Sequence, residues 1–348
     1  MIHIHFFFRF KNPLFFSIEK VFEGISGQII EQQPALFEVK KVFMPVKNGG
    51  WSIPSHLRFT RRNQGDINHI TGDIHYAILA CSSKQVNILT IHDCVLLKNR
   101  NRLNLTFWIF KWFWYDLPVR KADVVTVISE NTKKELIQFT GCDPNKVITI
   151  PNFISDLYCY QPKLFNDRCP KILFIGTTPN KNIFRLAMAL TEISCELEIV
   201  GKLSDDQEKA LTENKILFKI SEQLTEEQLL RKYIECDILT FPTTYEGFGL
   251  PIIEAQAVGR PVLTSLLSPM KEVAGDAASY CDPYSIDSIR NAINRIIKEP
   301  DFRNSLVMTG LENVKQYRIA EVTKQYSDLY QMYYRKKVRP GKETTNAF

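Results

Sequence analysis

A glycine-rich loop in the second half of the chain is the segment best suited to chemistry. Residues 241–255 read FPTTYEGFGLPIIEA. Gly247 and Gly249 allow the backbone to approach a ligand closely, and Pro251 suits the first turn of a helix. Such a loop directs backbone N–H groups and the positive end of a helix toward one point. This arrangement predicts a cradle for an anion or for hydroxyl groups.

Two carboxylates accompany this cradle. Glu246 lies in the loop, and Glu254 follows about one turn into the predicted helix, so both can face one ligand. The alternative is a surface turn with a solvated glutamate, followed by a helix glutamate in an ion pair. Two glutamates at this spacing would mean little alone, but the Gly-x-Gly-x-Pro pattern between them favours a binding site.

A second candidate segment follows the first predicted strand of the second half. Residues 174–182 read FIGTTPNKN, with Gly176 and Thr177 at the turn and Lys181 just before a predicted helix. A lysine next to the N–H groups of a helix start can hold a diphosphate. The alternative is a surface loop whose lysine merely starts the helix.

The first half offers polar residues at the ends of two short apolar runs. His92 and Asp93 end the run NILTIHD, and Ser129 ends ADVVTVIS. Asp93 can orient the His92 ring or accept from an acceptor hydroxyl. Ser129 is either a neighbour of a phosphate or simply the N-cap of the following helix. A lone histidine is also often structural.

These residues must be positioned by an alternation of strands and helices. Two successive series of apolar strands and helices predict two parallel, helix-covered sheets in an α/β protein. Ligands bind beyond the carboxyl ends of such strands, and the polar residues above fall there. The predicted strands are residues 2–8, 36–45, 67–70, 87–93, 122–129 and 147–151, and then, after a polar linker at 152–170, residues 171–176, 197–200, 237–241 and 261–264.

Composition fits a two-domain globular enzyme. The chain has 348 residues, of which 45% are hydrophobic and 24% charged. A net charge of +6 favours anionic ligands but is too small to predict nucleic-acid binding. The eight cysteines show no CxxC spacing, so we expect reduced core residues and no metal site. Residues 2–10 predict a strand rather than a signal peptide, and no window predicts a membrane span.

Residues 98–121 combine aromatic and basic side chains. Seven aromatic residues lie between positions 107 and 115, and the segment contains six lysines and arginines against one acid, Asp116. This composition suits a membrane interface. The alternative is a helix packed on the first sheet, because the aromatic residues are too continuous for a clean amphipathic stripe.

The segment 241–255 resembles the Glu-x7-Glu motif of the retaining glycosyltransferases of family GT4, which have the GT-B fold. The resemblance extends to SPMKEVAGDAA at 268–278, to ADVVTVISE at 122–130 and to IPN at 150–152. It is good over the second half and weak over the first hundred residues.

The resemblance implies roles for the candidate residues. Glu254 would hold the ribose hydroxyls of a nucleotide sugar, and Glu246 would lie at the donor sugar. The amides of Gly247, Phe248, Gly249 and Leu250 would contact the sugar and the diphosphate, while His92 would reach a sugar hydroxyl or line the reaction centre. It also implies retention of the anomeric configuration.

Two positions depart from the family pattern. Thr177 stands where many members carry a phosphate-binding arginine, so Lys181 acts alone or another basic residue compensates. The family's Gly-Gly loop after the first strand is also missing, and Arg9 or Lys11 would have to meet a phosphate there.

The sequence therefore predicts a GT-B protein with two Rossmann-like domains facing each other across a cleft. We expect an acceptor-side domain at 1–165, a donor domain at 166–318, a helix at 319–336 that crosses back to the first domain, and a frayed tail at 337–348. The predicted activity is metal-independent, retaining hexosyl transfer to a glycan or lipid-linked acceptor, in surface polysaccharide assembly. We expect a cytoplasmic enzyme without a cofactor, working at the inner face of the membrane if 98–121 docks there.

Two rivals stay open. A GT-B epimerase or hydrolase of nucleotide sugars would share the donor site but would act without an acceptor. A catalytically silent glycan-binding module would be expected to lose Glu246, Glu254 or Lys181, and all three are present. The sequence leaves open the base and sugar of the donor.

Overall fold

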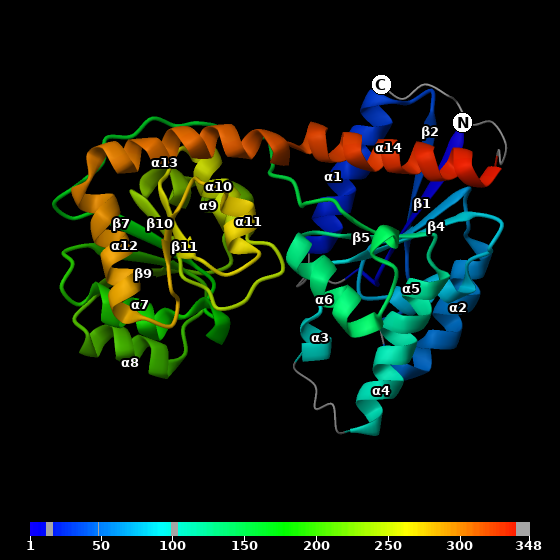
Figure 1. Cartoon of the computed structure of the whole chain (residues 1–348), viewed down its shortest axis with the longest axis horizontal. Helices are drawn as coiled ribbons and strands as arrows, with labels where there is room; N and C mark the ends of the chain where they lie inside the picture. Colours follow the sequence, from blue (N-terminus) through cyan, green and yellow to red (C-terminus); the bar gives the residue numbers. More distant parts are fainter. Residues whose placement is uncertain (12–16, 48, 99–103, 339–348) are drawn as a thin grey trace. The chain divides into compact units, whose positions relative to one another are not determined.

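The computed structural model describes residues 1–11, 17–47, 49–98 and 104–338, apart from the side chains of residues 17, 18, 50 and 338. The chain forms two compact units (Figure 1). The first comprises Met1–Phe153 together with the chain from Ile319 onward, and the second comprises Ile154–Arg318. Residues 12–16, part of the segment after the first strand where the family's Gly-Gly loop is missing, lie outside the described residues, as do Arg100 and Arg102 of the basic segment.

The first unit is built on a parallel sheet of six strands in the order β2-β1-β3-β4-β5-β6. Its central strands are almost wholly buried on both faces, as expected of a sheet covered by helices. The strands are β1 (Ile2–Phe8), β2 (Phe37–Phe43), β3 (Ile67–Ile70), β4 (Val86–Ile91), β5 (Val124–Val127) and β6 (Val147–Thr149).

Helices α1 (Ser17–Gln32) and α14 (Ile319–Val338) pack against each other and on this sheet. Phe22 of α1 and Tyr330 of α14 meet in one core with Phe6. The buried His69 of β3 bonds to the Tyr330 hydroxyl at 2.8 Å, and burial lowers the pKa of His69 to about 3. A neutral histidine thus ties the last helix to the first sheet.

A second core of the first unit lies between the sheet and the remaining helices. They include the π-helical turn η3, where an extra residue per turn lets a row of aromatic side chains share the core. The elements are α2 (Ile53–Arg62), η2 (His75–Ala80), α3 (Val95–Lys98), α4 (Leu105–Lys111), η3 (Trp112–Asp116), α5 (Leu117–Lys121) and α6 (Glu130–Thr140), with the 3-10 turns η1 (Gly50–Ser52) and η4 (Pro144–Lys146).

The second unit carries another six-stranded parallel sheet, in the order β12-β11-β10-β7-β8-β9. Its strands are β7 (Lys171–Ile175), β8 (Glu196–Val200), β9 (Leu217–Ser221), β10 (Ile238–Phe241), β11 (Val262–Ser265) and β12 (Ser279–Cys281). Its helices are η5 (Pro179–Lys181), α7 (Ile183–Leu190), α8 (Asp205–Glu213), α9 (Glu226–Glu235), α10 (Leu250–Val258), α11 (Met270–Ala274), α12 (Ile286–Lys298), α13 (Pro300–Asn313) and η6 (Val314–Tyr317).

The boundary between the units falls earlier than the sequence analysis placed it. Residues 154–165 were assigned to the first domain, but they pack within the second unit. The Arg260 guanidinium donates to the Gln161 carbonyl oxygen at 2.9 Å, and Lys163 forms an ion pair with the buried Asp237. Residues 154–165 are polar like a linker. They are nevertheless fixed in the second unit, because Arg260 and Asp237, which are buried and far away in the sequence, bind them.

No described helix combines the length and apolar character that a membrane crossing requires. All eight cysteines are free thiols; five of them are buried, as expected, whereas Cys142 and Cys169 are half-buried and Cys159 is exposed.

Candidate active site

The glycine-rich loop joins β10 to α10 at the carboxyl end of the second sheet. Gly249 has φ +110°, which an L side chain rarely adopts, and a Cβ there would lie 3.2 Å from Ile252. This glycine starts α10 directly, with Pro251 in the first turn and no side chain capping the helix. Phe248, predicted to lie at the donor, has its side chain buried against Tyr317. Only its backbone can serve a ligand.

Glu246 and Lys181 meet at the ends of two neighbouring strands. The Lys181 ammonium lies 2.7 Å from the Glu246 carboxylate, and both side chains are mostly buried. Thr243 and Asn180 donate to the same carboxylate oxygen at 2.8 and 3.2 Å. Lys181 also lies over the Phe241 ring at 4.5 Å. The residues predicted from two separate motifs thus form one charged, hydrogen-bonded group.

The turn after β7 makes room for this lysine. Gly176 has φ +86°, and a Cβ at this position would lie 2.8 Å from Cε of Lys181. A side chain at residue 176 would therefore push Lys181 away from Glu246. Asn182, in the left-handed region at φ +71°, anchors the turn by donating to the carbonyl oxygens of Pro242 and Pro283.

Thr177 does not take the place of a phosphate-binding arginine. Its hydroxyl donates to the Lys202 carbonyl oxygen at 2.6 Å, and its own carbonyl oxygen accepts from Gln207 at 2.7 Å. These bonds fix the turn to the start of α8. Lys181 is accordingly the cation that this turn brings to the site.

Glu254 lies on α10 and is held by a residue that the sequence analysis missed. The Tyr233 hydroxyl of α9 donates to the Glu254 carboxylate at 2.5 Å. Burial of the carboxyl raises the pKa of Glu254 to about 7, although the Tyr233 hydrogen bond opposes that shift. Tyr233 itself is fully buried and packs edge-on against Tyr158. The site therefore contains a carboxyl that changes charge near neutral pH.

In the first unit, His92 and Asp93 follow β4 as predicted. The His92 ring bonds through Nε2 to the Thr71 carbonyl oxygen at 2.9 Å, so this nitrogen carries the proton. Burial lowers the pKa of His92, which leaves a neutral ring with Nδ1 as an acceptor. Asp93 accepts from the Val95 amide at 3.0 Å, and burial raises its pKa. It caps the next turn, and the hydrogen bond that holds the His92 ring is the one to the Thr71 carbonyl oxygen.

Ser129 and Arg9 are engaged by their own unit. The Ser129 hydroxyl accepts from the Thr132 amide at 3.1 Å and caps α6, which is the simpler of its two predicted roles. Arg9 forms a forked pair with Glu19 at 2.6 and 3.1 Å and also reaches Asp73 at 3.4 Å. These two carboxylates compensate the charge of Arg9, so the geometry does not favour a phosphate there.

The candidate residues thus fall into two groups. Gly176, Lys181, Glu246 and Glu254 lie at the carboxyl edge of the second sheet, and His92, Asp93, Ser129 and Arg9 lie at that of the first. Each group belongs to one unit.

Three residues that bond to the site were not identified from the sequence: Asn180, Thr243 and Tyr233. Asn180 and Thr243 stand next to predicted site residues, and their polar side chains in strand-end loops were a usable signal. Tyr233 gave none, because only the packing of α9 on α10 brings it to Glu254. Within the described residues, no group of three or more His, Cys, Asp or Glu is arranged to hold a metal ion.

Two models of known protein families match this chain. The model of the family described as "Glycosyl transferases group 1" matches residues 161–312, and that of "Glycosyltransferase Family 4" matches residues 25–156. O-antigen chain mannosyltransferase B of Escherichia coli is 26% identical over 238 residues, a region that spans 61% of each chain. The match therefore covers less than two thirds of that relative.

Solved structures support the fold across nearly the whole chain. A sucrose-phosphate synthase from Thermosynechococcus elongatus superposes with a TM-score of 0.75 at 16% identity, over 96% of this chain and 99% of that one. Anabaena HepE in complex with UDP and glucose gives 0.72 at 16% identity, over 95% and 100%. The fold has two helix-covered parallel sheets, and a glutamate pair lies around the helix that starts at a glycine. Two family models match successive parts of the sequence. This chain is therefore a glycosyltransferase of the GT4 family with the GT-B fold.

Proposed function

We propose that the chain transfers a hexose from a nucleotide sugar to a glycan or lipid-linked glycan, with retention of configuration and without a metal ion. The observation that carries the proposal is the group formed by Lys181 and Glu246 beside the uncapped start of α10, with Glu254 on the same helix. The relatives named as O-antigen mannosyltransferases suggest mannose as the sugar and surface polysaccharide as the product.

Each residue has a task in this proposal. Glu254 accepts hydrogen bonds from the ribose hydroxyls. Lys181 breaks its ion pair with Glu246 and binds the diphosphate. Glu246 then becomes available to the hydroxyls of the donor sugar. The first-turn amides of α10 add the positive end of a helix dipole, which stabilises the charge that develops on the leaving diphosphate.

In this scheme, the acceptor hydroxyl is activated on the face of the donor sugar from which the diphosphate leaves. The bond from the anomeric carbon to the phosphate oxygen breaks, and the acceptor oxygen bonds to that carbon on the same face. The acceptor proton passes to the leaving phosphate, so the nucleoside diphosphate departs with it. His92, neutral and with Nδ1 available, accepts from a sugar hydroxyl and aligns the ring.

A donor panel tests the proposal. UDP-, GDP- and ADP-sugars, with mannose and glucose on each available base, are compared for thermal stabilisation of the full chain. A donor present at a hundredfold its Kd should stabilise the native state by about 2.7 kcal/mol. Transfer to a lipid-linked glycan acceptor should follow, with an α-anomeric product from an α-linked donor by NMR. Release of free sugar at the same rate without acceptor would instead indicate a hydrolase.

We further propose that the first unit docks on an anionic membrane surface through α4. Four apolar side chains of this region lie on one helical face at intervals of three and four residues. Each is at least half exposed: Leu105 72%, Trp108 53%, Ile109 58% and Trp112 52%. The neighbouring aromatic residues Phe107, Phe110 and Phe113 turn inward to the core. The continuous aromatic run therefore divides into a buried row and an exposed stripe, which the sequence analysis did not foresee.

Trp108→Ser/Trp112→Ser is expected to lower binding to phosphatidylglycerol vesicles about tenfold or more, because interfacial burial of two indoles is lost. Co-sedimentation with the vesicles measures this. Trp51→Ser is the matched control, since Trp51 is fully exposed but lies outside the stripe. Equal loss in the control, or no loss in the double variant, would contradict docking through α4.

A further inference from the structure

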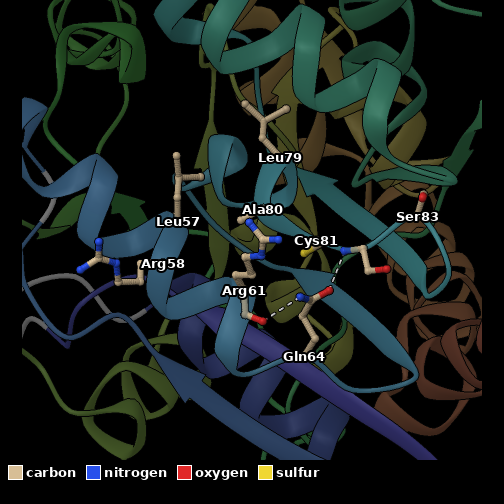
Figure 2. A pocket seen from close by; sticks show the side chains of 9 residues that line it. Leu57, Arg58, Arg61, Gln64, Leu79, Ala80, Cys81 and Ser83 are labelled. Atoms are coloured by element: carbon tan, nitrogen blue, oxygen red, sulfur yellow. Dashed lines mark hydrogen bonds between the residues drawn. The ribbon is translucent and has the colours of Figure 1, made fainter.

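An open pocket of about 630 Å³ lies in the first unit between α2 and η2 (Figure 2). Leu57, Arg58 and Arg61 of α2 contribute to one wall, and Leu79 of η2 contributes to another. Gln64 follows α2 and completes the lining between them. None of the nine lining residues is acidic.

The pocket lies at the edge of the first sheet opposite to the carboxyl edge that carries His92 and Asp93. Gln64 precedes β3, and Ser82, which also lines the pocket, precedes β4. His92 follows the other end of β4, which has six residues and therefore spans about 20 Å. A ligand in this pocket is thus separate from the groups at the carboxyl edge of the sheet.

The charge of the pocket comes from two arginines. Arg58 and Arg61 are three residues apart on α2 and therefore share one face of the helix. Neither guanidinium has a hydrogen bond, ion pair or ring contact with any residue that the structure describes. The sequence of α2, IPSHLRFTRR, contains no acid. The pocket consequently presents two uncompensated, fork-shaped donors, the groups best matched to phosphate oxygens.

The other walls are preformed and partly apolar. Gln64 donates to the Arg61 carbonyl oxygen at 2.9 Å and accepts from the Ser82 amide at 2.6 Å; Figure 2 shows both bonds as dashed lines. These bonds join the end of α2 to the loop before β4, so the pocket does not need to be ordered by its ligand. Leu57 and Leu79 add apolar surface beside the arginines.

We propose that this pocket binds a phosphate ester with an apolar portion, at a site independent of the sugar-transfer centre. The phosphate lies between Arg58 and Arg61, and the apolar portion lies against Leu57 and Leu79. A soluble metabolite and a phospholipid headgroup share this chemistry. The inference does not depend on the proposed transfer reaction.

Calorimetry with n-hexyl phosphate tests the site, with inorganic phosphate as the ligand that lacks the apolar portion. Wild type should bind hexyl phosphate more tightly than inorganic phosphate, and Arg58→Gln/Arg61→Gln should lower its affinity tenfold or more. Arg62→Gln removes the same charge from the next residue of α2, which does not line the pocket, and should bind as wild type. If the double variant does not fold, each single variant should lower the affinity at least threefold.

Vesicles of phosphatidylcholine with phosphatidic acid distinguish the two sources, in the Trp108→Ser/Trp112→Ser background. If Arg58→Gln/Arg61→Gln abolishes vesicle binding, the ligand is a lipid headgroup. If the variant binds vesicles as well as its parent but has lost its affinity for hexyl phosphate, the ligand is a soluble ester. Unchanged hexyl phosphate affinity in the folded double variant, or an equal decrease in Arg62→Gln, overturns the proposal. Unaltered sugar transfer in the double variant would show that the pocket is separate from the active site.

Discussion

Glu246→Ala is expected to lower kcat by about two to three orders of magnitude, because a preorganised group at the reacting sugar is lost. The same change leaves the Lys181 ammonium without its carboxylate partner. Lys181→Ala should lower kcat/KM by a similar factor, through loss of charge at the leaving diphosphate. Steady-state kinetics with the donor identified by the panel measures both.

Lys171→Ala is the matched control for these variants. Lys171 belongs to the same unit and also forms an ion pair, with Glu235 at 3.3 Å, but it starts β7 at the edge away from the site. Its replacement should leave kcat within about twofold, since exposed ion pairs contribute little. Near-normal turnover of Glu246→Ala, with thermal stability lowered as in a structural ion pair, would refute the catalytic role.

Glu246→Gln separates charge from hydrogen bonding. The amide oxygen can still accept from Thr243 and Asn180, so the loop should keep its shape. We expect Glu246→Gln to fold as wild type but to show most of the loss in kcat that is predicted for Glu246→Ala. An amide that restored turnover would mean that the carboxylate only shapes the loop.

Glu254→Gln is expected to weaken donor binding about tenfold or more while making the unliganded protein more stable above pH 7. Burial raises the pKa of Glu254 from its ordinary value of 4.5 to about 7. The folded chain therefore holds a proton that the unfolded chain releases, and wild type loses stability as pH rises from about 4.5 to about 7. Glutamine removes this loss. Calorimetry of donor binding and thermal melts between pH 5 and 8 measure the two effects.

The pH dependence of donor affinity follows from the same carboxyl. Ribose hydroxyls donate to the ionised form, so donor affinity should rise with pH up to about 7 and level off above it. Tyr233→Phe removes a hydrogen bond that lowers the Glu254 pKa, and it should move this midpoint to higher pH. Donor affinity that is equal in Glu254→Gln and wild type at pH 8 would contradict the assignment.

The fold was largely predictable because its strands are short, apolar and bounded by polar turns. The helix predicted to follow Ser129 is α6, which Ser129 caps and Gly141 ends in the left-handed conformation. The α/β class and the two sheets follow from the same alternation. Strands β9 and β12 and helices α2 and α8 were missed: β9 is an exposed edge strand with little apolar signal, β12 has only 3 residues, and both helices are predominantly polar.

The candidate site was predictable where its residues lie in the loops after strands or, like Glu254, in the helix that such a loop starts. Lys181 and Glu246 come from two such loops, and parallel pairing of β7 with β10 places the loops together. The hydrogen bond from Tyr233 to Glu254 depends on how α9 packs on α10, and no local pattern encodes that packing. The pairing of Arg9 was likewise not predictable, because its partners Glu19 and Asp73 lie in other elements, 10 and 64 residues away.

Determination of the donor complex tests the central claim most directly. The nucleotide should place its ribose hydroxyls about 3 Å from the Glu254 carboxylate. Its diphosphate should lie at Lys181 and the start of α10, and the Lys181–Glu246 ion pair should be open. A nucleotide bound elsewhere, or a bound donor that leaves this ion pair closed and Glu254 bonded only to Tyr233, would contradict the account.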